Sequence, residues 1–213
     1  SYYKDPNNTV LENIDLHIQS GETIGIIGGT GSGKSSLVNL LAGLYPISKG
    51  EVLLEGLPLA SYDKAQRMAR FGIVPQKAVL FAGTIKSNLL FGNENATEED
   101  MWQALTLAQA KEVVEGKDGM LDAMVAQGGK NFSGGQRQRI GIARALYHNP
   151  EILVFDEATS ALDNDTEKAV MDAVNSFHGK KTMVIIAHRL NTIAKCDVIY
   201  KVENEKIVES NLI

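Results

Sequence analysis

The sequence predicts an α/β fold, with a mostly parallel sheet as its core, an antiparallel β arm and a helical subdomain. Short apolar runs such as "ETIGIIG", "ILVF" and "MVIIA" are typical of buried strands. Segments with apolar residues at helical spacing follow the first two of these runs, and such alternation is typical of a parallel sheet covered by helices. The 213 residues, 44% hydrophobic and 22% charged, suit one globular domain.

The N-terminal part predicts two strands, a helix and a hairpin. "NIDLHI", residues 13–18, alternates polar and apolar side chains as a half-solvated strand does. "ETIGIIG" predicts a buried strand, and the apolar pattern that continues to Leu44 predicts a helix after it. "GEVLLEGLPL" predicts a hairpin arm with turns at Gly50 and Gly56.

The middle of the chain changes to helical patterning. A tract from about Thr97 to Val114 opens with a capping-box pattern, and a second helix is expected from Gly134 until Pro150 stops it. The last third returns to buried strands, with a helix over about 165–177. The prediction is therefore one domain over 1–213, with a core of about 1–75 and 150–213 and a helical subdomain of about 77–149.

Composition excludes several classes of function. The net charge of −5, with no stripe of Lys and Arg, argues against nucleic acid as a partner. The single cysteine, Cys196, cannot form an internal disulfide, and the N-terminus lacks the pattern of a signal segment. No apolar run approaches the ~20 residues that span a bilayer. Any membrane span is expected to come from another chain or another part of this one.

A glycine-rich loop stands between the predicted buried strand and the following helix. "GGTGSGKS" fits G-x-x-x-x-G-K-[ST], a loop that turns backbone N–H groups onto nucleotide phosphates at a helix N-terminus. Lys34 would supply a positive charge and Ser35 a hydroxyl for Mg²⁺. The residues expected to bind the phosphates are Gly28, Gly29, Thr30, Gly31, Ser32, Gly33, Lys34, Ser35 and Ser36.

Two adjacent carboxylates follow the apolar run "ILVF". An acidic residue at the end of a buried strand is placed to hold Mg²⁺ in nucleotide hydrolases, and Asp156 is in that position. Glu157 follows directly and is expected to polarise a water molecule. Without the upstream loop, both would be read more readily as a solvated strand exit.

A second anion site is predicted at the start of the helix that begins near residue 134. Ser133, Gly134 and Gly135 would present backbone N–H groups about a hundred residues beyond Lys34. One nucleotide needs only one phosphate loop. Two copies that pair head to tail, each closing the nucleotide of the other, would use both.

With these motifs in place, the chain resembles the ATP-binding cassette (ABC) ATPases over nearly its whole length. "GGTGSGKSS" looks like their phosphate loop, "FSGGQ" like their LSGGQ signature, and "ILVFDE" like the metal-binding strand with its catalytic glutamate. The resemblance implies binding or catalytic roles for further residues of the matching motifs. These are Gln76 as a metal-contacting and partner-sensing glutamine, Gln136 in the signature, Asp163 in the loop across the dimer interface, His188 near the γ-phosphate, and Tyr2 under the adenine.

The run "VPQKAVLFAGTIKSNLLFGN" is similar to exporter-type members of the family. The resemblance implies an ATPase whose cofactors are ATP and Mg²⁺, placed at the cytoplasmic face of the cell membrane. Its partners would be a second nucleotide-binding domain, identical or homologous, and a transmembrane domain, with no nucleic acid. Alternatives are a soluble ABC ATPase and a non-catalytic module that dimerises on ATP. A small-molecule kinase is a further alternative, but it leaves "FSGGQ" unexplained.

Overall fold

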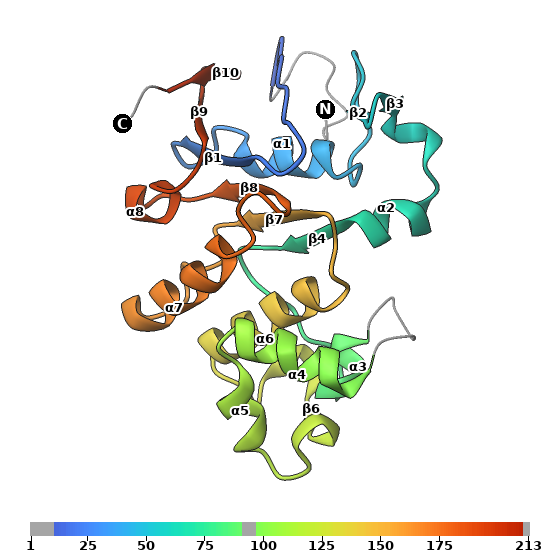
Figure 1. The fold of residues 1–213 in the computed structure, drawn as a ribbon, viewed down its shortest axis with the longest axis vertical. Coiled ribbons are helices and arrows are strands. Elements are labelled where there is room, and N and C mark those ends of the chain that lie inside the picture. The colour runs from blue at the N-terminus through green and yellow to red at the C-terminus, as the bar shows by residue number, and fades with distance from the viewer. Residues whose placement is uncertain (1–10, 91–96, 211–213) are drawn as a thin grey trace.

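The computed structural model describes residues 11–90 and 97–210. Its centre is a six-stranded sheet in the order β10-β9-β1-β8-β7-β4, in which only the β10–β9 pair is antiparallel. The predicted mostly parallel α/β sheet is confirmed (Figure 1). The strands of this sheet are β1 (Thr23–Gly28), β4 (Phe71–Val74), β7 (Ile152–Asp156), β8 (Thr182–Ile186), β9 (Val198–Glu203) and β10 (Lys206–Glu209).

Helices and short strand pairs connect and extend this sheet. Two two-residue antiparallel pairs lie outside it. They are β2 (Leu53–Leu54) with β3 (Leu57–Pro58), and β5 (Gly83–Thr84) with β6 (Met124–Val125). The helices are α1 (Lys34–Leu41), α2 (Lys64–Arg70), α3 (Ile85–Leu89), α4 (Glu98–Leu107), α5 (Lys111–Glu115), α6 (Gly134–Tyr147), α7 (Asn164–Asn175) and α8 (Leu190–Ile193), with single 3-10 turns over 59–61, 120–122 and 127–129.

The core divides into two clusters because alternate side chains of a strand point to opposite faces of the sheet. On β7, Leu153 and Phe155 belong to the cluster that includes α6 and α7, whereas Val154 belongs to the cluster that includes Leu37 and Val38 of α1. Each of these five side chains is at most 3% exposed. The uninterrupted apolar strands therefore reflect a sheet covered on both faces.

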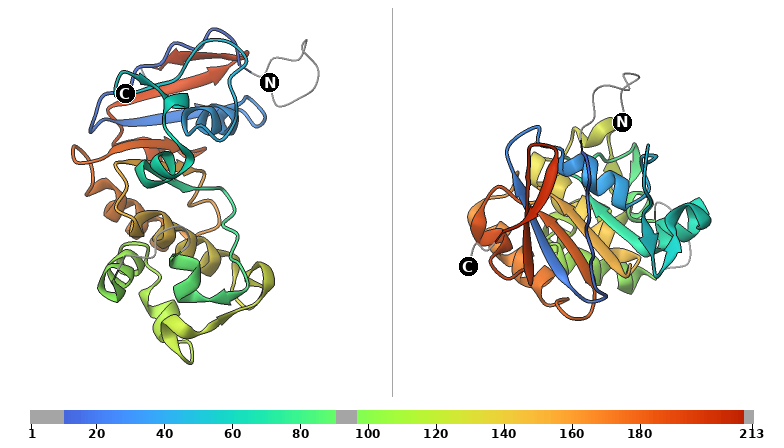
Figure 2. Two further views of the ribbon diagram at one scale, coloured as in Figure 1. Left: turned by 90° about the vertical axis from the view of Figure 1, so that its right-hand side faces the viewer. Right: turned by 90° about the horizontal axis from the view of Figure 1, so that it is seen from above.

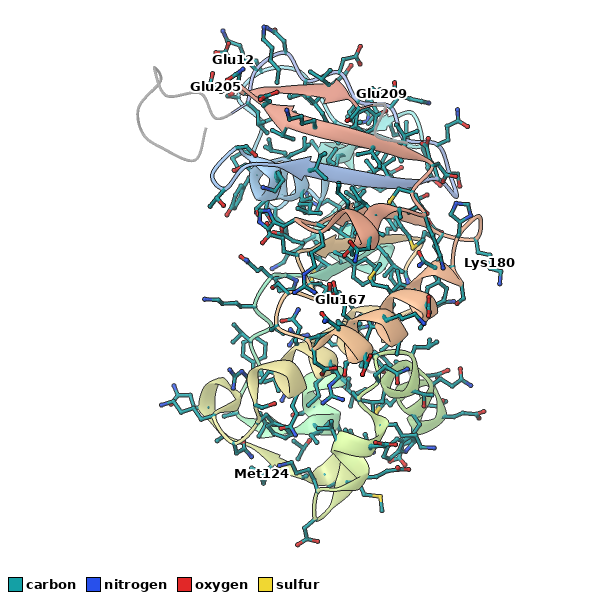
Figure 3. The ribbon with its side chains drawn as sticks, turned by 90° about the vertical axis from the view of Figure 1, so that its left-hand side faces the viewer. Glu12, Met124, Glu167, Lys180, Glu205 and Glu209 are labelled. Atoms are coloured by element: carbon teal, nitrogen blue, oxygen red, sulfur yellow. The ribbon has the colours of Figure 1, made fainter. Side chains whose placement is uncertain are left out.

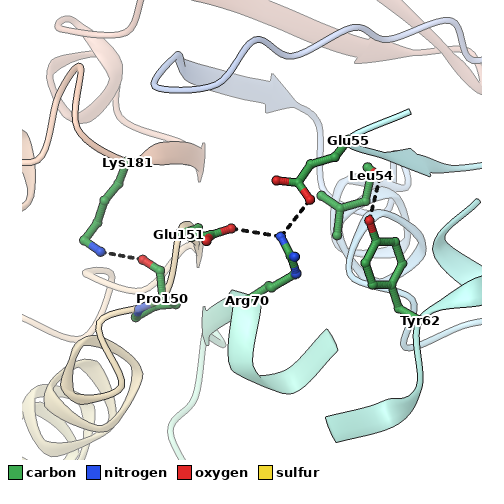
Figure 4. A network of polar contacts seen from close by, with 7 residues as sticks. All are labelled: Leu54, Glu55, Tyr62, Arg70, Pro150, Glu151 and Lys181. Atoms are coloured by element: carbon green, nitrogen blue, oxygen red, sulfur yellow. Dashed lines mark hydrogen bonds and ion pairs between the residues drawn. The ribbon is translucent and has the colours of Figure 1, made fainter. Parts of the chain in front are cut away.

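The molecule is elongated, with the sheet toward one end and α3 to α6 toward the other (Figure 2, left). Arg70, at the end of α2, fastens the hairpin arm to the sheet. Its guanidinium lies 2.9 Å from Glu55, in the turn between β2 and β3, and 3.1 Å from Glu151, just before β7 (Figure 4). The arm was predicted from its glycine turns. Gly56 there has a φ of 77° and Glu55 a φ of 53°, as a tight hairpin turn with two left-handed residues requires.

Three local expectations need correction. Residues 13–18 alternate in exposure as predicted but are not part of a strand. A backbone bond from Glu12 N to Glu205 O, 2.7 Å long, ties the preceding residue to the turn before β10, where Figure 3 shows the two residues side by side. A period-two pattern reports which side chains are covered, but a strand also needs a neighbour with free backbone groups.

The other two corrections concern where helices end. The tract predicted from Thr97 to Val114 is split into α4 and α5 by Gln109, whose φ is 56°. The N–H of Ala110 reaches back to the oxygen of Leu105 at 2.7 Å, which closes α4 in the manner of a Schellman motif. Similarly, α1 ends before Gly43, whose φ is 67°, so Leu44 lies outside the helix and is 57% exposed.

Candidate functional site

The glycine-rich loop joins β1 to α1, as its pattern predicts. Gly28, with a φ of 157°, and Gly33, with a φ of 101°, take conformations that glycine adopts most readily. A Cβ on Gly28 would come within 2.7 Å of Ser32 Oγ and 2.6 Å of Val202 O, so no larger residue fits there. A Cβ on Gly29 or on Gly31 would meet nothing within 4 Å, which leaves the outer side of the loop open to a ligand.

Lys34 lies inside this loop and is only 5% exposed. Its ammonium donates to the carbonyl oxygens of Gly28 at 2.8 Å and Gly29 at 2.9 Å. Gly33, at the N-cap of α1, provides no side chain to cap the first turn, and the buried Ser32 Oγ has no hydrogen-bond partner among the described residues. The loop therefore combines a held cation, a free hydroxyl and uncapped backbone donors, all of which suit phosphate oxygens.

Asp156, at the carboxyl end of β7, faces the same loop. Burial raises the pKa of Asp156 above its usual value; a hydrogen bond from Ser35 opposes this, the negative charge of Glu157 adds to it, and the positive charge of Lys34 opposes it. Its Oδ1 is buried without a hydrogen-bond partner among the described residues. The predicted neighbours Ser35 and Asp156 are thus in contact.

This pair fits a magnesium site by the chemistry of its donors. Mg²⁺ prefers hydroxyl, carboxylate and amide oxygens and usually retains several waters, so a few protein ligands are enough. Ser35, Asp156 and Gln76 offer those oxygens, and the unpartnered Asp156 Oδ1 is an available ligand. Within residues 11–90 and 97–210, no group of three or more His, Cys, Asp or Glu side chains could hold a metal by itself.

Glu157 is contacted by the two other residues expected to be catalytic. Gln76 Nε2 donates to Glu157 Oε2 at 2.7 Å, and His188 Nε2 lies 2.8 Å from Glu157 Oε1. The Glu157 side chain is 12% exposed, and its φ of 49° places the backbone in the left-handed region, which costs energy for a residue with a Cβ. Three segments distant in sequence therefore bring Gln76, Glu157 and His188 together beside Asp156.

The predicted second anion site lies at the N-terminus of α6. Ser133 caps the helix through a reciprocal pair with Gln136, in which Gln136 N donates to Ser133 Oγ at 3.2 Å and Ser133 N to Gln136 Oε1 at 3.0 Å. Ser133 and Gly134 are exposed, and a Cβ on Gly135 would lie 3.4 Å from the backbone oxygen of Ala161. Figure 1 shows α6 in the lower part of the molecule and α1 in the upper part, so the two helices belong to different parts of this copy.

Asp163 and Tyr2 were also predicted to belong to the site, and the structure describes only Asp163. Asp163 caps α7: it accepts hydrogen bonds from Thr166 N at 3.0 Å and Thr166 Oγ1 at 2.8 Å, and these bonds hold the pKa of its carboxyl below the usual range. The structure gives Asp163 a helix-capping role and places it in the loop that follows Glu157. Tyr2, expected under the adenine, lies outside the described residues.

Sequence reasoning missed Gln138, which holds the backbone of the loop that carries Gln76. Gln138 lies on α6 and is 2% exposed. Its amide oxygen accepts from Ala78 N at 3.0 Å and its amide nitrogen donates to Pro75 O at 2.9 Å, so the side chain holds the backbone on both sides of Gln76. No sequence motif marks Gln138, and its burial depends on the packing of the Gln76 loop against α6, which no local pattern reveals.

Comparisons with known proteins agree with this site. The sequence model described as "ABC transporter" matches residues 11–160. The ABC transporter ATP-binding protein YwjA of Bacillus subtilis, described as uncharacterized, is 41% identical over 98% of this chain. The ATP-dependent lipid A-core flippase of Chromobacterium violaceum is 39% identical over 97% of this chain. This chain spans about a third of the length of both relatives, 36% and 35%.

A solved structure is similar over the same range. The structure of a bacterial Atm1-family ABC exporter with ATP bound has a TM-score of 0.91 and 34% identity, over 97% of this chain and 36% of that one. The chain belongs to the ABC transporter family, of which it is an ATP-binding, ATP-hydrolysing domain. Among the residues that the structure describes, no helix is long and apolar enough to cross a membrane.

Proposed function

We propose that this domain drives export by a transporter whose membrane-spanning part lies outside these 213 residues, and that it works at the cytoplasmic face of the cell membrane. The relatives named above, a flippase and an exporter, support that role. We propose further that residues 1–213 form one nucleotide-binding domain, with a core of about 1–75 and 150–213 and a helical subdomain of about 77–149. The observation that carries the catalytic proposal is the contact of Glu157 with both Gln76 and His188 beside Asp156.

In the proposed reaction, the loop from Gly28 to Ser36 holds the phosphates of ATP. Lys34 exchanges its two carbonyl partners for phosphate oxygens, which are charged and therefore stronger acceptors. Mg²⁺, held by Ser35, Gln76 and Asp156, would supply positive charge that neutralises the phosphates. Glu157 orients a water molecule and accepts its proton as the water oxygen bonds to the γ-phosphorus, while His188 lies close enough to support the developing charge. The bond to the bridging oxygen breaks, giving ADP and phosphate.

Closure of the site requires a second copy or a homologous domain. The segment Ser133–Gln136, of which Ser133 and Gly134 are exposed, presents a polar helix N-terminus, and a head-to-tail pair would place it on the nucleotide of the partner. ATP would then hold two domains together and hydrolysis would release them. That cycle would move the membrane-spanning part.

Two variants test this proposal by separating nucleotide binding from hydrolysis. We expect Lys34→Ala to lower ATP affinity about tenfold to a hundredfold, because one charge-assisted hydrogen bond is worth roughly 1.5 to 3 kcal/mol. We expect Ser133→Arg to leave ATP binding nearly unchanged and to abolish hydrolysis, because the bulky cation would occupy the gap between two copies. Titration with ATP and measurement of phosphate release give both quantities.

The outcome also separates the alternatives. Unchanged ATP affinity in Lys34→Ala would remove the phosphate-loop assignment. Equal loss of binding and turnover in Ser133→Arg would place Ser133 in a site within one chain. Wild-type protein that binds ATP without releasing phosphate would be a dimerisation module instead of an ATPase.

A further inference from the structure

Glu167 ties together the segments that carry two residues of the proposed catalytic site. It lies near the start of α7, between the sheet and the helical part of the molecule (Figure 3), and its side chain is 12% exposed. Thr159 Oγ1 donates to Glu167 Oε1 at 2.8 Å, and Thr192 Oγ1 donates to the same oxygen at 3.3 Å. The guanidinium of Arg189 donates to the other oxygen, Oε2.

The partners of Glu167 lie in the two segments that directly follow Glu157 and His188. Thr159 follows Glu157 by two positions and is 6% exposed, and Arg189 follows His188 directly. Glu167 therefore binds the segment just after Glu157 through Oε1, and the segment after His188 through both oxygens, by way of Thr192 and Arg189. The partners of Glu167 in these hydrogen bonds are Thr159, Arg189 and Thr192, none of which belongs to the predicted phosphate loop.

This cluster acts more by fixing the positions of two segments than through the electrostatic energy of its ion pair. The Arg189 side chain is 50% exposed, and an ion pair so close to solvent contributes little to stability. The Glu157 backbone, in contrast, is in a left-handed conformation that persists only when its surroundings over-determine it. A hydrogen bond to Thr159, fixed through a carboxylate with three partners, is a restraint of that kind.

We propose that Glu167 is a positioning residue that sets Glu157 and His188 at the distance that hydrolysis requires. The inference rests on the proposed function, because it assigns Glu167 to the same catalytic site. It acts through Thr159 on one side and Arg189 on the other, without touching the nucleotide. Loss of the carboxylate lets the two segments move independently, while the phosphate loop and its affinity for ATP stay as they were.

The test compares Glu167→Gln, Glu167→Ala and Arg189→Met in the full-length protein. The control is Asp172→Asn, which removes a carboxylate of the same helix that is 54% exposed and pairs with Lys168 and Lys195. We expect kcat for ATP hydrolysis to fall on the order of tenfold to a hundredfold in Glu167→Ala, since displacement by about 1 Å can have that effect. Glu167→Gln retains part of the hydrogen bonding, so its kcat should lie between those of Glu167→Ala and the wild type. KM for ATP should stay near the wild-type value in all four, and Asp172→Asn should retain its kcat.

A second measurement does not depend on hydrolysis. Amide hydrogen exchange should become faster in residues 157–162 and 187–192 together in Glu167→Ala, at temperatures well below unfolding, and not in Asp172→Asn. If Glu167→Ala and Arg189→Met both retain wild-type kcat, or if exchange rises uniformly over the whole chain, the positioning role is wrong. A wild-type protein that releases no phosphate would refute the proposed function instead. The exchange measurement would still show whether Glu167 couples residues 157–162 to residues 187–192.

Discussion

Asp156 shows how a single buried carboxylate links the candidate site to the stability of the protein. Its pKa is raised chiefly by burial, so its charged form is disfavoured in the folded, nucleotide-free protein. The folded state therefore binds the proton more tightly than the unfolded state does. The stabilisation that protonation gives is complete below the unfolded pKa and is lost as the pH rises through the folded pKa.

This sign predicts the behaviour of Asp156→Asn. The neutral amide avoids the penalty of the buried charge, so at neutral pH the nucleotide-free variant should melt at a higher temperature than the wild type. A gain of 1 kcal/mol corresponds to about 2 to 4 °C in Tm for a chain of this size. The difference should shrink as the pH falls through the folded pKa of Asp156, because the wild type then becomes neutral as well.

Thermal melting of both proteins between about pH 4 and pH 8 measures this difference, without nucleotide. The exposed Asp118 provides the control, since Asp118→Asn removes the same charge at the surface. A variant that melts below the wild type throughout would mean that contacts of the carboxylate with Ser35 and Lys34 outweigh its burial.

At the scale of elements, the sequence predicted what depends on local chemistry. The caps at Thr97 and Ser133 are both formed, each with a reciprocal bond to the residue three positions on. The buried strands and the glycine loop followed from apolar runs and from one motif. Contacts between segments distant in sequence could not be predicted in this way: the split at Gln109, the lack of a strand over 13–18 and the burial of Gln138 depend on them.

The interface between α6 and the loop of Gln76 provides a prediction at this scale. Gln138→Leu would leave Pro75 O and Ala78 N without their partner, at about 1 to 3 kcal/mol for each buried group that stays unpaired. We expect a lower Tm and, because Gln76 is no longer held against Glu157, a lower kcat for ATP hydrolysis. Nearby packing is tight, since a Cβ on Gly141 would lie 2.4 Å from Ala78 Cβ, so the loop has little room to find another arrangement.

Differential scanning calorimetry and a phosphate-release assay follow the two effects. Gln103→Leu, at an exposed position of α4, is the matched control for the same change in side chain. If Gln138→Leu lost stability yet kept the wild-type kcat well below its Tm, Gln138 would support the fold alone.

At the scale of the whole molecule, the phosphate loop and the Ser133–Gln136 segment belong to different parts of an elongated chain. The contacts of Glu157 with Gln76 and His188 lie on the sheet side of this division, at the end of β7. A pair of copies would bring both parts to one nucleotide. The lifetime of that pair would then depend on how fast ATP is cleaved.

Glu157→Gln should make the pair long-lived. The amide retains the size of the side chain but loses the basicity that proton removal needs, and it removes a negative charge next to the γ-phosphate. We expect phosphate release to fall by at least about a hundredfold, the lower end of what a positioned base contributes. With ATP and Mg²⁺, the purified chain should then elute as a dimer in size-exclusion chromatography, and with ADP as a monomer.

The double variant Lys34→Ala with Glu157→Gln is the control, because it should bind ATP too weakly to dimerise. A Glu157→Gln chain that binds ATP and stays monomeric would point to an obligatory partner of different sequence. Turnover at the wild-type rate would exclude Glu157 as the base.

With Glu157 as the proposed base, its left-handed backbone would set heat resistance and ATP turnover in opposition at this position. Glycine would relieve roughly 1 to 2 kcal/mol of steric strain, and asparagine part of it. Neither can present a carboxylate to Gln76 and His188. Directed evolution that selects only for survival after heating would thus favour replacement of this glutamate. The selected variants would be more thermostable but would no longer hydrolyse ATP.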